Sequence, residues 1–354
     1  MTRNREHPPV QSAKHLHELL KRDIEAHKYA PGEKLPSVRE LSMAYQVNKS
    51  TVVNVLATLA NAGLIRTEAG KGSFVLAAKE ELKQIAVLFF DSTLPIRVDT
   101  EILAHIQKNI KSGYYLSLHD TSQNYRLFEQ KIEALVESGN VHGFIAIPPK
   151  WYTPQPDDVA RLNRLLGDRI PLVFIIRNIE GVSADYFSMD LDKGVQKAVA
   201  YLSSNNKKRI CVIKHDSQKF VDEELSGLEI ACRKHQIPIY PEYILEFDEN
   251  IETVKSRLLS ILDEIDAIIA SDLLLCSLQG VLRDSGKRIP EDLSIIGIND
   301  VVSHFFHKPL TSIRFPVEQI GIHAIHTMIS RLENGGGVEK ITKNIVPDLV
   351  IRET

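Results

Sequence analysis

Small polar side chains that can bind DNA gather at the start of one predicted helix, in the stretch Asn-Lys-Ser-Thr-Val-Val-Asn that ends at Asn54. The hydroxyls of Ser50 and Thr51 can donate to phosphate oxygens near a helix N-terminus, and Lys49 adds a positive charge. The amide of Asn54 can pair with both polar atoms of an adenine edge, and Val53 can contact a thymine methyl group. This spacing indicates chemistry suited to the major groove of DNA.

A helix-turn-helix is expected to position these side chains. Apolar residues recur at helical spacing over residues 49–61, which predicts a helix with Asn48 as its N-cap. The inward face of this helix is expected to contain Val52, Val55, Leu56 and Leu59.

A shorter helix is expected before the turn at residues 45–48. Ser37 and Glu40 have the spacing of a capping box, so this helix should begin near Val38. We expect its buried side to contain Val38, Leu41 and Met43 or Ala44.

Two short strands follow, at residues 64–67 and 73–76. The segment between them holds Gly70, Lys71 and Gly72, which predicts a narrow, positively charged hairpin tip that can lie against a phosphate backbone. This hairpin would be the wing of a winged helix-turn-helix.

Residues 11–76 resemble the DNA-binding domain of the GntR family of bacterial regulators, through the motif Leu-Pro-Ser-Val-Arg-Glu-Leu, the start of the second helix and the glycines of the wing. The resemblance implies DNA contacts by Arg39, which follows Ser37 in that motif, and by Lys49, Ser50, Thr51, Gly70 and Gly72. Many family members have arginine at the position of Val53, so their operator sequences do not carry over to this chain.

The charge distribution restricts DNA binding to the N-terminal part of the chain. Residues 1–78 hold 11 Lys or Arg against 7 Asp or Glu, whereas the other residues hold 32 against 39, and the whole chain has a net charge of −3. Because DNA attracts basic surfaces, only the first 78 residues suit it.

From Gln84 onward, short apolar runs alternate with amphipathic segments. This order predicts parallel, doubly wound sheets that bind ligands beyond the carboxyl ends of their strands. Strands are expected at residues 85–90, 115–118, 144–147, 172–176, 210–213, 267–270 and 294–298, with helices at 102–111, 128–137, 195–203 and 225–235.

Several motifs of this part resemble the sensor domain of the LacI/galactose-repressor family: Asp-Ala-Ile-Ile-Ala-Ser-Asp at 266–272, the stretch 286–300 ending in Ile-Gly-Ile-Asn-Asp, and Pro-Leu-Thr-Ser-Ile at 309–313. Residues 316–321 and 347–354 are similar to the last helix and last strand of that family. The resemblance covers residues 84–354 and implies a two-lobed fold, like that of periplasmic binding proteins, with a small-molecule effector between the lobes.

By matching position, the resemblance implies effector contacts from nine residues, several of them in the loops that follow strands. Two depart from the family pattern, because Glu224 stands in place of a sugar-binding arginine and Asn299 in place of an aspartate. The nine are Phe90, Asp91, Trp151, Arg177, Asp190, Phe220, Glu224, Asp272 and Asn299.

This set suits a polyol, because carboxylate and amide groups bind vicinal hydroxyls, Arg177 can bridge two of them and Trp151 offers a face for a sugar ring. Each residue also has a structural interpretation. Trp151 can pack a loop or a dimer surface, Arg177 can pair with a neighbouring acid, and Asp190 and Asp272 can cap helices. The polar segment 216–224 is expected to be a loop at the mouth of the cleft.

The sequence contains no glycine-rich phosphate loop, nucleophile elbow or paired-carboxylate site, so we expect no enzyme and no cofactor. Cys211, Cys232 and Cys276 are far apart, and the histidines lack metal-ligand spacing, so we expect reduced thiols and no metal. A signal peptide and an apolar run long enough to span a membrane are both missing, which predicts a cytoplasmic protein.

These features predict an α/β protein with a winged helix-turn-helix at residues 1–78, a linker at 79–83 and a two-lobed sensor at 84–354, whose chain changes lobe near 183–190. The expected function is repression of a carbohydrate-utilisation operon by a homodimer that binds double-stranded operator DNA and senses a sugar. The alternatives are a purine or sugar-phosphate effector, an enzyme, and a binding protein without DNA-linked function.

Overall fold

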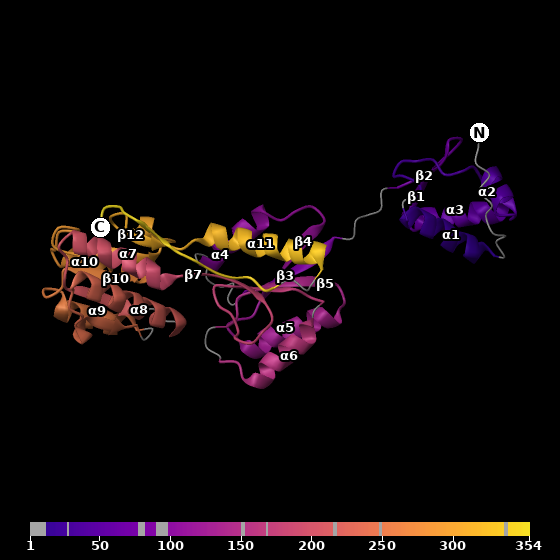
Figure 1. Ribbon diagram of the computed structural model, residues 1–354. Helices are drawn as coiled ribbons and strands as arrows, with labels where there is room; N and C mark the ends of the chain where they lie inside the picture. The colour runs from indigo at the N-terminus through magenta and orange to yellow at the C-terminus, as the bar shows by residue number, and fades with distance from the viewer. Residues whose placement is uncertain are drawn as a thin grey trace. The chain divides into compact units, whose positions relative to one another are not determined.

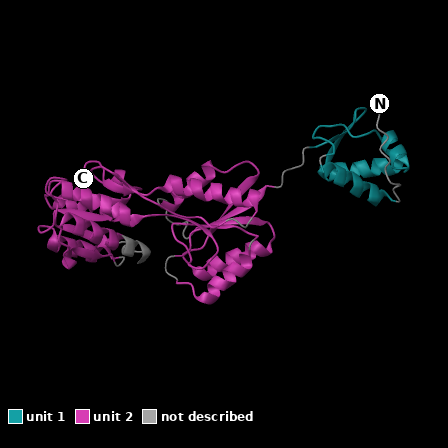
Figure 2. Ribbon diagram, viewed as in Figure 1, with its two compact units in different colours: residues 1–81 teal, residues 82–354 magenta. Residues whose placement is uncertain are grey.

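The computed structural model describes residues 12–26, 28–76, 82–89, 98–149, 153–167, 169–214, 218–247, 250–335 and 339–354, with only the backbone of 218–223. The chain divides into two compact units, residues 1–81 and residues 82–354 (Figure 2). Each unit is built around cores of its own, so each is described separately.

Unit 1 is a three-helix domain with a β-hairpin. Its elements are α1 (Ala13–Glu25), α2 (Val38–Ala44), α3 (Lys49–Asn61), β1 (Ile65–Glu68) and β2 (Gly72–Val75). Helices α1 and α3 pack together around Leu16, Leu20, Val52 and Leu59, which are fully buried. The predicted inward face of α3 is therefore confirmed: Val52, Val55, Leu56 and Leu59 are all buried.

The expectation for the buried side of α2 was partly wrong. Leu41 is buried, but Met43 is 67% exposed and Ala44 is also exposed, while Tyr45 fills the core after the helix. Met43 lies two residues from Leu41, which is about 200° around a helix, so both cannot face the core. Gln46, with a φ of 55°, then turns the chain toward α3.

Unit 2 contains two parallel six-stranded sheets, each at the centre of one lobe. The strand orders are β13-β7-β6-β5-β3-β4 in the first lobe and β14-β12-β11-β10-β8-β9 in the second. Strand β14 pairs with β12 in antiparallel orientation, and the other strand pairs are parallel. The prediction of an α/β fold with doubly wound parallel sheets is confirmed.

The first lobe contains β3 (Lys83–Phe89), α4 (Val98–Lys108), β4 (Tyr114–Asp120), α5 (Tyr125–Glu137), β5 (Val141–Ala146), α6 (Pro156–Leu166), β6 (Leu172–Ile175), β7 (Asp185–Met189), α11 (Val317–Asn334) and β13 (Thr342–Ile345). Helices α4 and α11 cover one face of its sheet, and α5 and α6 cover the other (Figure 1). Because side chains alternate along a strand, Ile85 and Val87 of β3 pack under the first helix pair and Ala86 and Leu88 under the second.

The second lobe contains α7 (Leu191–Ser204), β8 (Ile210–Lys214), α8 (Gln218–His235), β9 (Ile244–Glu246), α9 (Ile251–Ile261), β10 (Ala267–Ser271), α10 (Asp272–Asp284), β11 (Ser294–Asn299), β12 (Thr311–Arg314) and β14 (Asp348–Val350), with 3-10 turns at Pro241–Tyr243 and Ser303–Phe305. Helix α7 packs closely on α8.

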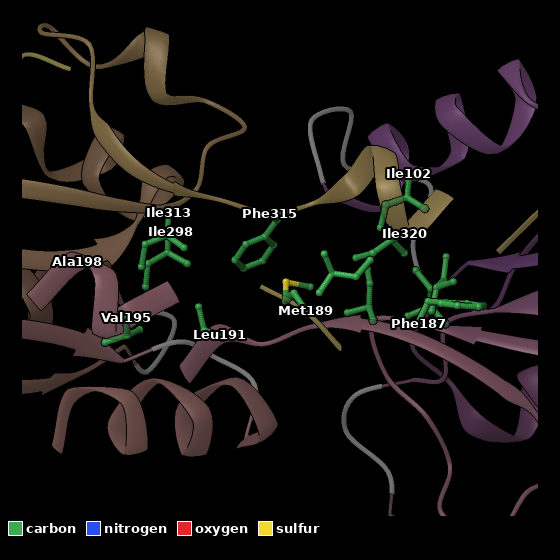
Figure 3. Close-up of a cluster of buried hydrophobic side chains, with 14 of the residues drawn as sticks. Ile102, Phe187, Met189, Leu191, Val195, Ala198, Ile298, Ile313, Phe315 and Ile320 are labelled. Atoms are coloured by element: carbon green, nitrogen blue, oxygen red, sulfur yellow. The ribbon is translucent and has the colours of Figure 1, made fainter. Parts of the chain in front are cut away.

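The chain passes between the lobes three times, after β7, after β12 and after β13. Apolar residues at these crossovers join the two lobes into one continuous core. Figure 3 shows Met189 and Phe315 between Ile320 of the first lobe and Ile313 of the second. Met189 and Phe315 are buried, so the crossovers after β7 and β12 are packed segments, whereas Val346, after β13, is 44% exposed.

Two sequence expectations for unit 2 differ from the structure. The segment 216–224 was expected to be a loop, but α8 begins at Gln218. From that residue on, the segment contains one Gln, one Lys and two Glu, which favour helices, and it has no Gly or Pro. Strands β7, β9, β12 and β13 were not predicted. In β7, Asp185 and Ser188 interrupt the apolar pattern. Both are buried, and Asp185 forms an ion pair with Arg331 at 2.7 Å.

Strand β3 begins at Lys83, a residue that the sequence assigned to the linker; residues 77–81 lie outside the described residues. Among the helices that the structure describes, none is long and apolar enough to cross a membrane.

Gly227 tests how closely α7 and α8 approach. A Cβ at this position would lie 2.5 Å from the backbone oxygen of Asp192, so Gly227→Ala must push the helices apart and should destabilise the protein by about 1–3 kcal/mol. Gly280 of α10 has nothing within 4 Å of the corresponding position, so Gly280→Ala should stabilise by about 0.5–1 kcal/mol. Urea unfolding measures both; equal midpoints for the two variants would contradict the close approach.

Candidate DNA-binding and effector-binding sites

Helix α3 presents the predicted DNA-reading residues on one exposed surface. Lys49, Ser50, Val53 and Asn54 are exposed and Thr51 is half-buried, because the opposite side of the helix is in the core. Val53 is 52% exposed although it is apolar. The surface is small and mildly basic, which lets the helix backbone approach the bases of a major groove.

The N-terminus of α3 is a place where an anion can bind, as at other helix N-termini. Asn48 occupies the N-cap position with an extended backbone, as predicted, but its side chain makes no capping hydrogen bond within the described chain. First-turn N–H groups that lack a side-chain cap can donate to phosphate. Ser50 and Thr51 lie in the same turn.

The capping box of α2 is confirmed. The Ser37 N–H donates to Glu40 Oε2 at 2.7 Å, and the Glu40 N–H donates to Ser37 Oγ at 3.3 Å. The backbone hydrogen bond from Ser37 lowers the pKa of the Glu40 carboxyl, so the box stays intact at neutral pH. The box fixes the first turn from which Arg39 extends as an exposed side chain.

The wing is a hairpin in which Glu68 of β1 lies opposite Gly72 of β2. Gly70 and Gly72 have φ angles of 74° and 114°, which favour glycine. Gly72 is also needed for space, because a Cβ would lie 2.7 Å from Cε of Lys34. The tip residue Lys71 is 73% exposed but contacts Glu68 at 3.1 Å, so the tip is less positive than the sequence pattern indicated.

In unit 2, Asp272 and Asn299 lie at the carboxyl ends of two adjacent parallel strands, β10 and β11. Asp272 is 1% exposed; its Oδ1 accepts from Ser312 Oγ at 2.7 Å. Its Oδ2 and the Oδ1 of Asn299 are buried and have no hydrogen-bond partner among the described residues. Buried oxygens of this kind are what a hydroxyl-bearing ligand would satisfy.

Gly297 makes room for the Asp272 carboxylate, since a Cβ there would lie 1.9 Å from Oδ1. Burial raises the pKa of Asp272 to about 7, and the hydrogen bond from Ser312 opposes this only in part. The carboxyl can therefore change its protonation state near neutral pH, which is expected at a binding site more than in an ordinary core.

The next residue, Asp300, connects Asp272 and Asn299 to the crossover that follows β12. Its carboxylate accepts from Arg314 Nε at 2.6 Å and from Arg352 at 2.7 and 2.9 Å. The Asn299 carbonyl accepts from the Phe315 N–H at 3.5 Å. Both Arg314 and Phe315 lie where the chain leaves β12 for the first lobe, so Asn299 and Asp300 contact a crossover directly.

Asp190 has the helix-capping role that the sequence allowed, and Arg177 has a backbone partner that the sequence did not indicate. Asp190 is the N-cap of α7 and accepts from the Lys193 N–H at 3.1 Å, while Arg177 Nε donates to the Pro148 carbonyl at 3.1 Å. Both residues follow strands at the carboxyl edge of the first sheet. Glu224 is fully buried on α8.

The remaining effector candidates, Phe90, Asp91 and Trp151 together with the side chain of Phe220, lie outside the described residues. The structure brings Asp272 and Asn299 together. It adds Ser312, Asp300 and Arg314, which sequence reasoning missed as site residues although Ser312 and Asp300 lie in the quoted motifs. Glu68 of the wing was missed as well.

Two protein-family models match the chain. The first, bacterial regulatory proteins of the gntR family, covers residues 12–75, and the second, a periplasmic binding protein-like domain, covers residues 199–354. The first match falls on the domain with the α3 surface. The second falls on the lobe that holds Asp272 and Asn299, together with α11 and β13 of the first lobe.

Whole-chain relatives carry regulator names. The chain is 26% identical over 340 residues to the arabinose metabolism transcriptional repressor of Geobacillus stearothermophilus, covering 92% of each chain. It is 25% identical over 252 residues to the HTH-type transcriptional repressor PurR of Vibrio vulnificus, covering 69% of this chain and 73% of the relative.

Solved structures share the fold of unit 2. The periplasmic binding protein/LacI transcriptional regulator from Alkaliphilus metalliredigens, complexed with D-xylulofuranose, matches with a TM-score of 0.61 at 20% identity, covering 77% of this chain and 98% of that one.

The raised pKa of Asp272 predicts a pH dependence of stability. Because the folded protein favours the protonated carboxyl, its contribution is fully present below the ordinary pKa of 3.8 and is lost as the pH rises through about 7. Asp272→Asn should remove this loss, so the variant should be the more stable protein at about pH 8 and gain less at about pH 5. Thermal unfolding of both proteins at each pH measures the difference; a pH-independent difference would contradict it.

Proposed function

We propose that this DNA-binding transcriptional regulator, which joins a gntR-family domain to a periplasmic binding protein-like domain, is the repressor of a carbohydrate-utilisation operon. Its operator affinity would be controlled by a sugar bound between the two lobes of unit 2. The observation that carries the proposal is the pair of buried acceptor oxygens on Asp272 and Asn299 at adjacent strand ends.

The chemistry of this pair suits a polyol. The Asp272 carboxylate can accept from two hydroxyl groups, and the Asn299 amide can both accept and donate. The family relationship supports the same ligand class, since the relative from G. stearothermophilus is named as a repressor of arabinose metabolism. The A. metalliredigens structure holds a sugar in the same fold.

A purine or phosphorylated effector is the alternative, and the charges of the site argue against it. A phosphate group near the strand ends would meet the buried Asp272 carboxylate, because the neighbouring cations Arg314 and Arg352 are already paired with Asp300. Like charges in a buried site repel strongly, so these residues favour a neutral sugar over a phosphate.

Control of DNA binding would be a population shift between closure angles of the two lobes. A sugar that engages Asn299 would bias the backbone contact from Phe315 and the ion pair between Asp300 and Arg314, and thereby one of the three crossovers. In a homodimer, a change of closure would alter the spacing of two reading domains. Half-sites about one helical turn apart, or a multiple of it, suit such a dimer.

In the reading domain, we assign phosphate contacts to Ser37, Arg39, Lys49, Ser50, Thr51 and the wing residues Gly70, Lys71 and Gly72, and a base contact to Asn54. These residues are exposed on α2, α3 and the hairpin, apart from the half-buried Thr51 and Gly72. We place the protein in the cytoplasm, where the operator DNA is, and assign it no catalytic step.

Variants of Asn54 and Lys49 can distinguish a base contact from a phosphate contact. Asn54→Ala should relax the preference at one operator position by roughly 1–3 kcal/mol and leave binding to other sequences unchanged. Lys49→Ala, five residues earlier in α3, should weaken binding to all duplexes about equally and reduce the salt slope by about one unit. Operators selected from a random pool and titrated over a salt series measure both effects. Uniform losses for Asn54→Ala would remove its base contact.

A thermal-shift screen against sugars, sugar phosphates and purines tests the effector class. A sugar at about a hundredfold excess over its dissociation constant should stabilise the protein by about 2.7 kcal/mol. Asp272→Ala should abolish that shift, while Asp284→Asn, an exposed carboxylate on the same helix, should retain it. A shift with a purine or phosphate and none with sugars would overturn the carbohydrate assignment and keep the regulator.

A further inference from the structure

The wing contains a carboxylate that contacts both of its cations. Glu68 Oε1 lies 3.3 Å from Arg66 Nη2, and Glu68 Oε2 lies 3.1 Å from Lys71 Nζ. Arg66, Glu68 and Lys71 are the charged residues of segment 66–72, so one acid is shared by two bases.

The hairpin geometry fixes this arrangement. Glu68 ends β1, its carbonyl accepts from the Lys71 N–H at 3.1 Å, and the turn between them contains Gly70 in a left-handed conformation. Arg66 is held on the other side by its position 5.7 Å over the ring of Phe74. Glu68 is 31% exposed, whereas Arg66 and Lys71 are 62% and 73% exposed.

A DNA phosphate that approaches the wing would compete with Glu68 for the same cations. If the ion pairs persist, the carboxylate lies close to the phosphate and repels it. If the ion pairs break, the free energy of the phosphate contacts is reduced by the free energy of the lost ion pairs. In either case the carboxylate reduces the number of counterions that the wing releases from DNA.

We propose that Glu68 is a restraining residue, which weakens the hold of the wing on DNA phosphates and lowers the sequence-independent part of DNA affinity. This inference rests on the proposed contact between wing and DNA. Phosphate contacts carry no sequence information, so the restraint acts on operator and random DNA alike. The DNA affinity of such a regulator depends more on the base contacts of α3. The protein therefore dissociates from DNA more easily when α3 is moved out of position.

The test replaces Glu68 with Gln in the full chain and measures binding to a random-sequence duplex over a salt series. Glu68→Gln should bind roughly 3- to 10-fold more tightly at about 0.1 M salt, and its salt slope should be steeper by up to about one unit. Glu25→Gln is the matched control, because Glu25 is an exposed carboxylate on α1 that pairs with Lys21 at 3.8 Å. It makes the same charge change away from the hairpin tip and should alter binding little.

A double mutant identifies the route of the effect. In the Lys71→Ala background, Glu68→Gln should increase the affinity for the random-sequence duplex by a smaller factor. The reason is that one of the two cations paired with Glu68 is already missing. Thr67→Ala, which removes the 3.1 Å contact with Ser73 in the same hairpin, controls for loosening, since a looser wing should bind more weakly.

Three results would contradict the proposed role of Glu68 or the wing contact on which it rests. Equal gains for Glu68→Gln and Glu25→Gln would assign the effect to net charge and overturn the proposal. Unchanged or weaker binding by both Glu68→Gln and Glu68→Ala would overturn it as well. Normal binding by both Arg66→Ala and Lys71→Ala would instead reject the wing contact itself, a separate failure.

Discussion

The shared apolar core at the three crossovers is the constraint on which the sensor unit depends. Each crossover is short, and residues such as Met189, Leu191 and Phe315 are buried against both lobes. Packed segments resist continuous deformation, because interiors are close-packed and have few voids. In the proposed closure, each lobe is therefore expected to move as a whole body, with the backbone change confined to the few residues that join the lobes. A small displacement at a strand end beside a crossover would then change the angle between the lobes.

The candidate effector site lies beside one of these crossovers, and its residues reduce the stability of the folded protein. Asp272 is a buried carboxyl whose pKa is raised to about 7, and Asn299 and Asp300 have left-handed backbones. Residues in such conformations persist only when surrounding contacts hold them, and they gather at functional sites. Here the ion pairs of Asp300 with Arg314 and Arg352 supply those contacts. The same contacts attach the site to a crossover, so one group of residues both holds the strained loop and connects it to the hinge.

The fold could be predicted from the sequence where local patterns decide the structure. The capping box at Ser37, the helical repeat of α3 and the apolar runs of the sheets are determined by neighbours in the chain, and the structure contains each of them. Strand β7 was missed because its buried Asp185 is neutralised by Arg331, a partner 146 residues away. Periodicity cannot reveal such a pairing. The misplaced Met43 shows a second limit, since a seven-residue helix buries too few positions to define a face.

The same distinction explains why site residues were only partly predicted. Asp272 and Asn299 follow apolar strands, so the sequence gives their place at the sheet edge, but their unpaired oxygens depend on three-dimensional packing. The charge of the wing is a similar case: the pattern Gly-Lys-Gly indicated a positive tip, whereas its effective charge depends on the reach of the Glu68 side chain. Affinity for phosphate is thus set within unit 1, which has its own core. In the proposed homodimer, an effector bound in unit 2 would have no need to change that affinity. It would act by changing whether two reading domains of fixed strength can bind at once, and weaker individual domains would make this dependence on geometry steeper.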